Sequence, residues 1–444
     1  MLKKPYSKVY LASAIASLFP LSSAHATDGH ILHGVGSINQ SMGGAGIATS
    51  IDAIGSSYNN VSSISFLKKG SIEFGAELFV PDRSLSSSVV TPYGGAEGTV
   101  HSKSRESIIP SIGLAYHIDP DWTFGFTALG IGGFGVDYPA NQPNNTGQFS
   151  PISTPQKFGG FGSIYSNYQL LQITPSIAYK VTPDLSVGLG YNIDWSSLAV
   201  NPWPATPPNA SGYPNGSQNA TAWGQGFTVG STYQALDNLA LGVSFKSPQW
   251  FNKFGWNAQY PDGDPASFNY QLDYPLIVGG GASYLPVEDL TLALDLKWIN
   301  YSGTRGFEQS NFAPSPTGPY VKGFGWEDIF AVALGSQYKV TKELSLRAGY
   351  NYADNPIPGN QQFFNVFAPA IVQHHLTVGA GYDITTNLGI NLAYYHGFNS
   401  EKTGPFISSG APGYPPINTQ VPGTSVTNSL TENSGSLQVT YKFD

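Results

Sequence analysis

Long stretches of the chain alternate between large apolar residues and small or polar ones. In residues 185–195 every odd position is large and apolar, and every even position is small or polar. Successive side chains of a β-strand point to opposite faces, so such a segment has one apolar and one polar face. In a soluble sandwich the apolar face would pack into a core. In an outer-membrane barrel it would face lipid, and the polar face would line a lumen.

About fourteen such segments predict an all-β fold, an antiparallel transmembrane β-barrel. An even number of antiparallel strands can close with both termini on the periplasmic side. Closure matters because lipid offers no hydrogen bonds to a sheet edge. The predicted strands are residues 70–90, 98–118, 122–137, 164–181, 184–201, 219–235, 238–260, 267–286, 289–310, 319–340, 343–355, 371–384, 387–400 and 429–443.

The connections between these strands are of two kinds. Six are short polar turns, and long loops rich in Gly, Pro and Asn lie between them, such as residues 140–160, 201–218 and 401–427. Short turns at one end and long loops at the other are typical of outer-membrane barrels. The strand faces are also readable: Leu292, Leu294 and Leu296 point one way, and Asp295 and Lys297 point the other.

Composition favours lipid over water as the surroundings of the apolar faces. Charged residues make up 11% of the 444 residues, against roughly 25% in a typical soluble domain. Aromatic residues make up 13%, in keeping with the Tyr and Trp that barrels place at membrane interfaces. Cysteine is absent, and the net charge of −8 argues against a nucleic-acid partner.

Two segments precede the barrel, which we expect at residues 70–444. Residues 1–26 have a basic start, a short apolar run and a small-x-small ending at Ala24–Ala26, which predicts a secretory signal peptide. Residues 27–69 do not alternate; they are small, Gly-rich and poor in charge. We expect this second segment to form a plug, or hatch, inside the barrel.

Residues 42–46 read Met-Gly-Gly-Ala-Gly, with Asp52-Ala53 and Asn59 following. This segment resembles the hatch of the FadL-type outer-membrane channels, which transport long-chain fatty acids and other hydrophobic compounds. Further stretches resemble the same family in the same order along the chain, at residues 324–328, 333–335, 346–350 and 355–358. By this resemblance the hatch includes Met42, Gly43, Gly44, Gly46 and Asn59.

The resemblance implies a passive channel in the bacterial outer membrane, without cofactor or enzymatic activity, which we expect to be a monomer in contact with outer-membrane lipid. Extracellular loops would capture a hydrophobic molecule such as a fatty acid or hydrocarbon. The molecule would enter a pocket in the lumen, the hatch would move, and the molecule would leave sideways at a kink of the third strand.

The third predicted strand contains four glycines in six residues: Gly130, Gly132, Gly133 and Gly135. Three of them match G-x-G-x-x-G, but no helix follows and no βαβ unit surrounds them, which excludes a dinucleotide site. Glycine within a strand marks a bulge or kink. By the resemblance this is the lateral opening; the alternative is a bend that only shapes the barrel.

Other polar residues have weaker assignments. The resemblance makes Lys322 a lumen partner for a ligand headgroup; the alternative is a solvated loop lysine. The chain departs from the family at Asn60, which follows Asn59 where the family has proline. Arg347 shares the polar face of its strand, and we expect it to pair with lumen acids such as Asp328 or Asp295. His30, His33 and the pair at 374–375 lack a carboxylate cluster that would complete a metal site.

Two other functions remain alternatives. A general porin for polar solutes would have an open, charged lumen, and single-channel conductance would identify it. A lipid-modifying enzyme of the outer membrane would require a Ser–His–acid arrangement, for which the sequence gives no pairing signal.

Overall fold

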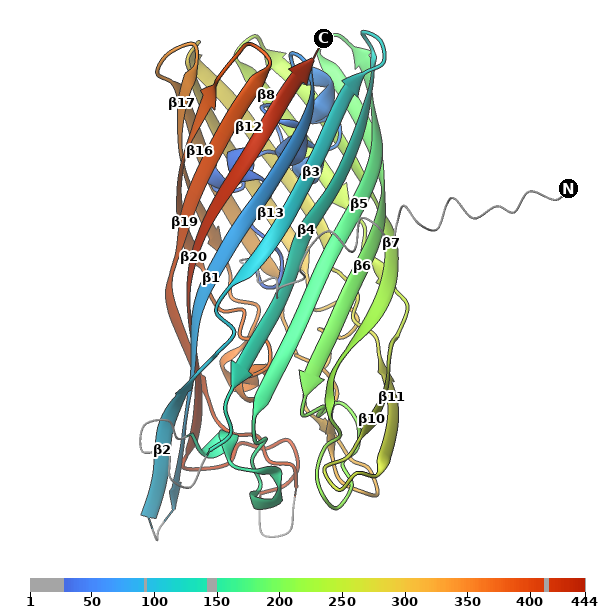
Figure 1. Ribbon diagram of the computed structural model, residues 1–444, viewed down its shortest axis with the longest axis vertical. Coiled ribbons are helices and arrows are strands. Elements are labelled where there is room, and N and C mark those ends of the chain that lie inside the picture. The colour runs from blue at the N-terminus through green and yellow to red at the C-terminus, as the bar shows by residue number, and fades with distance from the viewer. Residues whose placement is uncertain (1–27, 92–93, 142–149, 411–414, 444) are drawn as a thin grey trace, which may run out of the picture.

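The computed structural model of the protein describes residues 28–91, 94–141, 150–410 and 415–443. The predicted signal peptide, residues 1–26, lies outside the described residues. Fourteen antiparallel strands close into a barrel (Figure 1). They are β1 (Gly70–Thr91), β3 (Ser107–His117), β4 (Trp122–Tyr138), β5 (Ile164–Thr182), β6 (Leu185–Asn201), β7 (Gly216–Leu236), β8 (Leu239–Lys246), β12 (Leu276–Val287), β13 (Leu290–Asn300), β16 (Ile329–Lys339), β17 (Leu344–Ala353), β18 (His374–Asp383), β19 (Leu388–Gly404) and β20 (Thr424–Phe443).

The barrel closes at its first strand. β1 pairs with β20 along one edge, from Gly70 opposite Phe443 to Val89 opposite Thr424, and with β3 along the other. Every strand of the ring therefore has a neighbour on both sides, as a sheet surrounded by lipid requires. The fold class predicted from the alternation is confirmed.

Side-chain exposure follows the predicted faces. Leu292, Leu294 and Leu296 are 40%, 41% and 55% exposed on the outside, whereas Asp295 between them is fully buried. In β20, Leu437 and Tyr441 point outward, and Gln438 is buried in the lumen. The apolar face therefore covers the outside of the barrel and the polar face lines its interior.

Several strands are shorter than predicted because the chain leaves the barrel at its loop end. The predicted strand 98–118 is two elements: β2 (Gly94–His101) pairs with the end of β1, and only β3 belongs to the ring. The predicted strands 238–260 and 267–286 are interrupted near Pro248 and Pro275, residues that cannot donate to a ladder. The segments beyond them form loop structure, namely β9 (Trp250–Phe251), β10 (Phe254–Gln259), β11 (Pro265–Tyr270), β14 (Phe312–Ala313) and β15 (Tyr320–Val321).

The two ends of the barrel differ (Figure 1). The six short turns and the C-terminus gather at one end, and the long loops gather at the other with the short helices η2 (Pro151–Ser153), η3 (Gln156–Phe158) and η4 (Gly359–Asn365). Among the described residues, no helix is both long and apolar enough to cross a membrane.

The segment before β1, residues 28–69, lies inside the barrel toward the end with the short turns (Figure 1). It contains α2 (Ser37–Ser41), α3 (Ala53–Asn59) and η1 (Ser63–Phe66), and all but a few of its residues are buried. We call this segment the hatch. A plug inside the lumen, which the sequence predicted, is thus part of the fold.

Candidate functional site

The hatch is fixed by lumen carboxylates that accept hydrogen bonds from its backbone. Asp295 of β13 accepts from the amides of Gly46 (2.7 Å) and Ile47 (2.9 Å). Glu73 of β1 accepts from Ala53 (2.9 Å) and Ile54 (3.1 Å), the first amides of α3, which have no partner within the helix. Both carboxylates therefore satisfy backbone donors that the irregular hatch leaves open.

The barrel wall has glycine at many of the positions where the hatch packs closely against it. A Cβ atom added to Gly242 would lie 2.5 Å from the carbonyl oxygen of Ile47, and one added to Gly349 would overlap the backbone of Met42 and Gly43. Glycine at these positions lets two backbones approach closely. We call these residues the glycine collar: Gly113, Gly188, Gly230, Gly242, Gly279, Gly335, Gly349 and Gly379.

The hatch residues taken from the family resemblance have different roles. Met42 is buried against Ala45, Ala293 and Ala333. Gly43 and Gly44 have φ values of +66° and +83°, a conformation that glycine adopts without strain. Gly46 makes the hydrogen bond to Asp295 described above.

Asn59 does not touch the wall through its amide, because its Nδ2 donates to the carbonyl of Gly55 within α3 (3.0 Å). The neighbouring Asn60 joins the hatch to β7 instead. Its Nδ2 donates to Ile47 O (2.8 Å) and to Thr232 Oγ1 (3.1 Å), and its Oδ1 accepts from Ser62. The sequence did not distinguish the two asparagines, because an irregular segment has no periodicity that assigns side-chain direction.

Aromatic rings fill the lumen on the loop side of the hatch. His30 stacks on Phe307 with ring centroids 4.7 Å apart, and Phe307 lies 4.7 Å from Trp326. Burial lowers the pKa of His30 to about 3, so its ring is neutral and acts as one more aromatic surface. We call this group the aromatic cluster: His30, Phe134, Tyr168, Tyr274, Tyr301, Phe307, Phe324 and Trp326.

The glycine-rich part of β4 has lost its neighbour on one side. The ladder between β3 and β4 ends at Ser111 opposite Leu129, and Pro110, the next residue of β3, has no N–H to donate. The ladder with β5 continues through a bulge between Gly130 and Gly132. The glycines singled out from the sequence therefore lie at a bulge in β4 where its pairing with β3 has ended.

The hatch occupies the edge of β4 that β3 leaves open. Ile31 forms a bridge with Gly132; the amide of Leu32 donates to Ile131 O (3.1 Å), and the amide of Gly133 donates to His30 O (2.9 Å). A Cβ atom on Gly132 would overlap the His30 carbonyl. The sequence predicted the glycine kink and the hatch separately and did not predict that they pair.

A model of the family described as "Outer membrane protein transport protein (OMPP1/FadL/TodX)" matches residues 18–408. The chain belongs to this family. The long-chain fatty acid transport protein of Salmonella typhi is 22% identical over 346 residues, which cover 64% of this chain and 77% of that protein. The protein of the same name from Escherichia coli (strain K12) is 24% identical over 198 residues, which cover 40% and 43%.

Solved structures of the family share the fold. The Pseudomonas aeruginosa FadL homologue superposes with a TM-score of 0.70 at 17% identity, covering 94% of this chain and all of that one. The P. putida toluene transporter TodX gives 0.65 at 19% identity, covering 93% and 99%. The predicted family and the predicted location in the outer membrane are confirmed.

The charged residues singled out from the sequence lie apart in this FadL-family barrel. Arg347 is buried, and its Nε and Nη1 donate to Gln337 (2.7 Å) and Asn391 (3.0 Å). Asp328 lies just before β16, and its carboxylate accepts a hydrogen bond from the side-chain amide of Asn300, the last residue of β13. The expected pairing of Arg347 with Asp328 or Asp295 is not found in the structure, because amides satisfy the guanidinium and other donors satisfy the two carboxylates.

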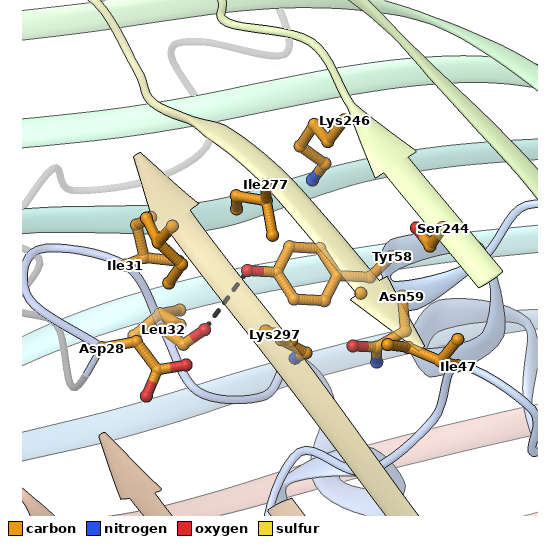
Figure 2. Close-up of a pocket in the computed structure, with 12 residues that line it drawn as sticks. Asp28, Ile31, Leu32, Ile47, Tyr58, Asn59, Ser244, Lys246, Ile277 and Lys297 are labelled. Carbon is orange, nitrogen blue, oxygen red and sulfur yellow. Dashed lines mark hydrogen bonds between the residues drawn. The ribbon is translucent and has the colours of Figure 1, made fainter. Parts of the chain in front are cut away.

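Lys322 lies in the loop between β15 and β16, and its side chain is exposed. Two other lysines of the barrel strands face the lumen. Lys246 of β8 is buried, and Lys297 of β13 is half-buried. Both line a cavity between the hatch and the wall with Asp28 and Tyr58 (Figure 2). Alternation predicted that Lys297 faces the lumen, but the cavity depends on how the irregular hatch packs, which no sequence pattern gives.

No three His, Asp or Glu side chains of the described ranges are grouped to hold a metal ion.

Proposed function

We propose that this protein is a passive outer-membrane channel for hydrophobic molecules, either long-chain fatty acids or hydrocarbons. The observation that carries the proposal is the filled lumen: a seated hatch blocks the turn end, and aromatic rings line the space on the loop side. A general porin needs an open, polar lumen. Apolar and aromatic surfaces are typical of sites for greasy ligands.

Capture takes place at the extracellular loops. Trp203 and Trp256, from the β6–β7 loop and β10, have ring centroids 4.7 Å apart and pack on Phe268 of β11. These rings are buried among the loops, so they offer a hydrophobic molecule an apolar surface outside the lumen only when the loops move apart. The exposed Lys322 supplies a cation nearby in the loops for the headgroup of a fatty acid.

The ligand then leaves sideways through the wall at the kink of β4. Support for this exit comes from the missing β3–β4 ladder beyond Leu129 and from the glycines that leave no side chains in its place. Residues 30–32 close the edge through a bridge and two flanking hydrogen bonds. Movement of the hatch away from β4 opens the gap, and no energy source is required.

Uptake and conductance measured on one preparation test the function. We expect cells that express the protein to take up labelled oleate or toluene, whereas planar bilayers containing the purified protein show no large steady conductance. Large conductance without uptake of either compound would contradict the proposal and indicate a porin.

A substitution at the kink tests the lateral exit. A Cβ on Gly132 would overlap the His30 carbonyl, so Gly132→Leu forces residues 30–32 away from the edge of β4. We expect the exit to stay open and uptake to change markedly, while ligand binding in the loops is retained. The matched control is Gly435→Leu on the outer face of β20, where an added Cβ has open space. Unchanged uptake by the Gly132 variant would exclude the lateral route.

Replacing Lys322 by alanine tests the headgroup contact in the loops. We expect a larger loss of affinity for oleate than for a neutral hydrocarbon, because only oleate carries a charge. Equal losses for both ligands would remove Lys322 from the path.

A further inference from the structure

The opening in the wall beside the glycines of β4 is closed at both ends. At the turn end it begins where the β3–β4 ladder stops, at Ser111 opposite Leu129. β4 continues toward the loop end beyond β3 (Figure 1). There the amide of Lys103 donates to the carbonyl of Asp137 (2.8 Å), and the amide of Asp137 donates to Ser102 Oγ (3.0 Å). The opening is therefore a slit within the sheet and does not run out to the loops.

The pairing register is the same at the two ends of the slit. Continued past Leu129, the register of β3 with β4 places Lys103 opposite Asp137, the two residues that are joined there. Residues 104–110 therefore face residues 130–136 across the slit. With a rise of about 3.3 Å per residue, the slit is about 25 Å long. Because both edges have the same number of residues, neither has spare chain that would let it bow far from the other.

Residues 102–104, which we call the strap, are tied to β1 as well as to β4. The amide of Ser102 donates to Arg83 O (2.9 Å), and the buried guanidinium of Arg83 donates from Nη1 to Ser104 O (3.2 Å). The hydroxyl of Ser102, which accepts from Asp137, also accepts from the amide of Ser104 (3.2 Å). The strap therefore ties β4 to β1 across the loop end of the slit.

These ties limit the width of the slit. Neighbouring strands lie about 4.8 Å apart where they are hydrogen-bonded, as they are at both ends of the slit. Near the turn end the two edges also touch, because a Cβ atom added to Gly130 would lie 2.5 Å from Cγ2 of Ile109. A slit held at strand spacing at both ends opens only in its middle, where residues 30–32 of the hatch lie against β4. The slit is therefore long and narrow.

We propose that the strap makes the lateral exit selective for the cross-section of the ligand. The inference rests on the proposed function and narrows its substrates to slender chains and flat rings. An acyl chain that spans one leaflet, half of the hydrocarbon core, is about 15 Å long, so it can leave through the slit along its whole length. A flat ring can leave edge-on, whereas a globular cage requires the two edges to separate at the strap. Arg83 and Ser102 are positioning residues, because they act through the strap and not on the ligand.

Uptake of two fatty acids of equal charge and similar length tests this limit. One is oleate, and the other is undecanoate capped with an adamantyl cage. We expect the wild type to take up oleate and to exclude most of the capped acid. The double variant Arg83→Met/Ser102→Ala loses the side-chain ties of the strap, so uptake of the capped acid should rise about tenfold while oleate uptake changes less than about twofold. Lys103→Ala is the matched control and should behave as the wild type, because the exposed side chain of Lys103 is not part of the tie that its backbone makes.

A reversible cross-link tests whether the strap itself sets the limit. The chain has no cysteine, and residues opposite each other in an antiparallel pair have Cα atoms about 5 Å apart, within reach of a disulfide. In the background of the double variant, Lys103→Cys with Asp137→Cys should exclude the capped acid when oxidised and admit it when reduced. The dissociation constants of both acids should be the same in the two redox states, because the cross-link acts on the exit and not on binding.

Equal uptake of both acids by the wild type would overturn the inference, as would a double variant that still excludes the capped acid. Exclusion that is the same in the oxidised and reduced cysteine variant would also overturn it. If the wild type takes up neither acid, the proposed function itself fails. The heat-dependent shift in gel mobility, typical of folded barrels, shows that each variant has folded. If Arg83→Met prevents folding, Ser102→Ala alone takes its place, with a smaller expected rise.

Discussion

The two halves of the lumen are filled by different means. Toward the turn end, the hatch is seated by directional hydrogen bonds and by close contact with the glycine collar. Its backbone amides donate to Asp295 and Glu73, and its Asn60 side chain donates to Thr232 of the wall. Toward the loop end, the aromatic cluster fills the space by ring stacking. Hydrogen bonds and close backbone contacts tolerate little displacement, whereas apolar packing accepts another apolar molecule of suitable size. Under the proposed function, we infer that the first half seals the lumen and that the second half exchanges its contents for ligand.

The largest effect is expected from adding a side chain to the glycine collar. The Cβ of Gly349→Val would overlap the backbone of Met42 and Gly43, which has no other place to go while seated. Overpacking of this kind costs about 3 kcal/mol. We expect the hatch to leave its seat and the purified protein to show porin-like conductance in planar bilayers.

Gly435→Val is the control for this conductance measurement, because its added side chain points into open space outside the barrel. It should remain closed. A closed Gly349 variant that folds normally would show that the hatch adapts to the wall, and it would remove the contrast between the two halves.

The next largest effect is expected at the carboxylate that holds the hatch. Asp295→Asn loses the charge that accepts from Gly46 and Ile47, and its amide nitrogen cannot accept at all. Losing charge-assisted hydrogen bonds costs about 2 kcal/mol, or about thirtyfold in the opening equilibrium. Amide hydrogen exchange at Gly46 and Ile47 should quicken accordingly, whereas Asp121→Asn in an exposed turn should leave it unchanged.

A smaller effect, confined to the other half, is expected at Phe307. Phe307→Leu loses the stacking on His30 and the tilted ring contact with Trp326, and such ring pairs contribute about 1 kcal/mol beyond buried area. We expect faster amide exchange at His30 and altered affinity for hydrophobic ligands, with the channel still closed to ions. Phe330→Leu on the lipid-facing side of β16 is the control. An open channel in Phe307→Leu would mean that the aromatic cluster also seals.

Alternation could predict the barrel because a strand with lipid on one side and lumen on the other repeats with period two. Leu292, Leu294 and Leu296 lie outside, and Asp295 lies inside, as this pattern requires. Strand ends were less predictable. Pro248 and Pro275 interrupt the ladder, but the alternation continues past them into the loops, so the pattern alone does not show where the chain leaves the ring.

Only part of the hatch and of the candidate site could be predicted from the sequence. The glycines of β4 and of residues 42–46 mark places where backbones approach, but not which backbones meet there. The pairing of Ile31 with Gly132, the wall contacts of Asn60 and the cavity at Lys297 all depend on the path of an irregular segment. No periodicity assigns side-chain direction in such a segment.

The smallest expected effect concerns Asp52, which begins α3 and accepts from the amide of Gly55 (3.2 Å). Burial raises the pKa of Asp52. The hydrogen bond from Gln438 and the charge of Arg347 lower this pKa, and the nearby Glu73 carboxylate interacts with Asp52 by charge. The seated hatch therefore binds this proton more tightly than the released hatch. The contribution of this proton to seating decreases as the pH rises above 3.8, the ordinary pKa of an aspartate, and it returns on acidification.

Asp52→Asn removes this titration and keeps the cap, because asparagine begins helices as well as aspartate does. We expect hatch amides of the wild type to exchange faster at pH 7 than at pH 5, after correction for intrinsic rates, and this difference to be smaller in the variant. The remaining pH dependence belongs to the other lumen carboxylates. An equal pH dependence in both proteins would mean that Asp52 keeps its ordinary pKa. The hatch would then be held by hydrogen bonds and backbone contact alone, with no contribution from this proton.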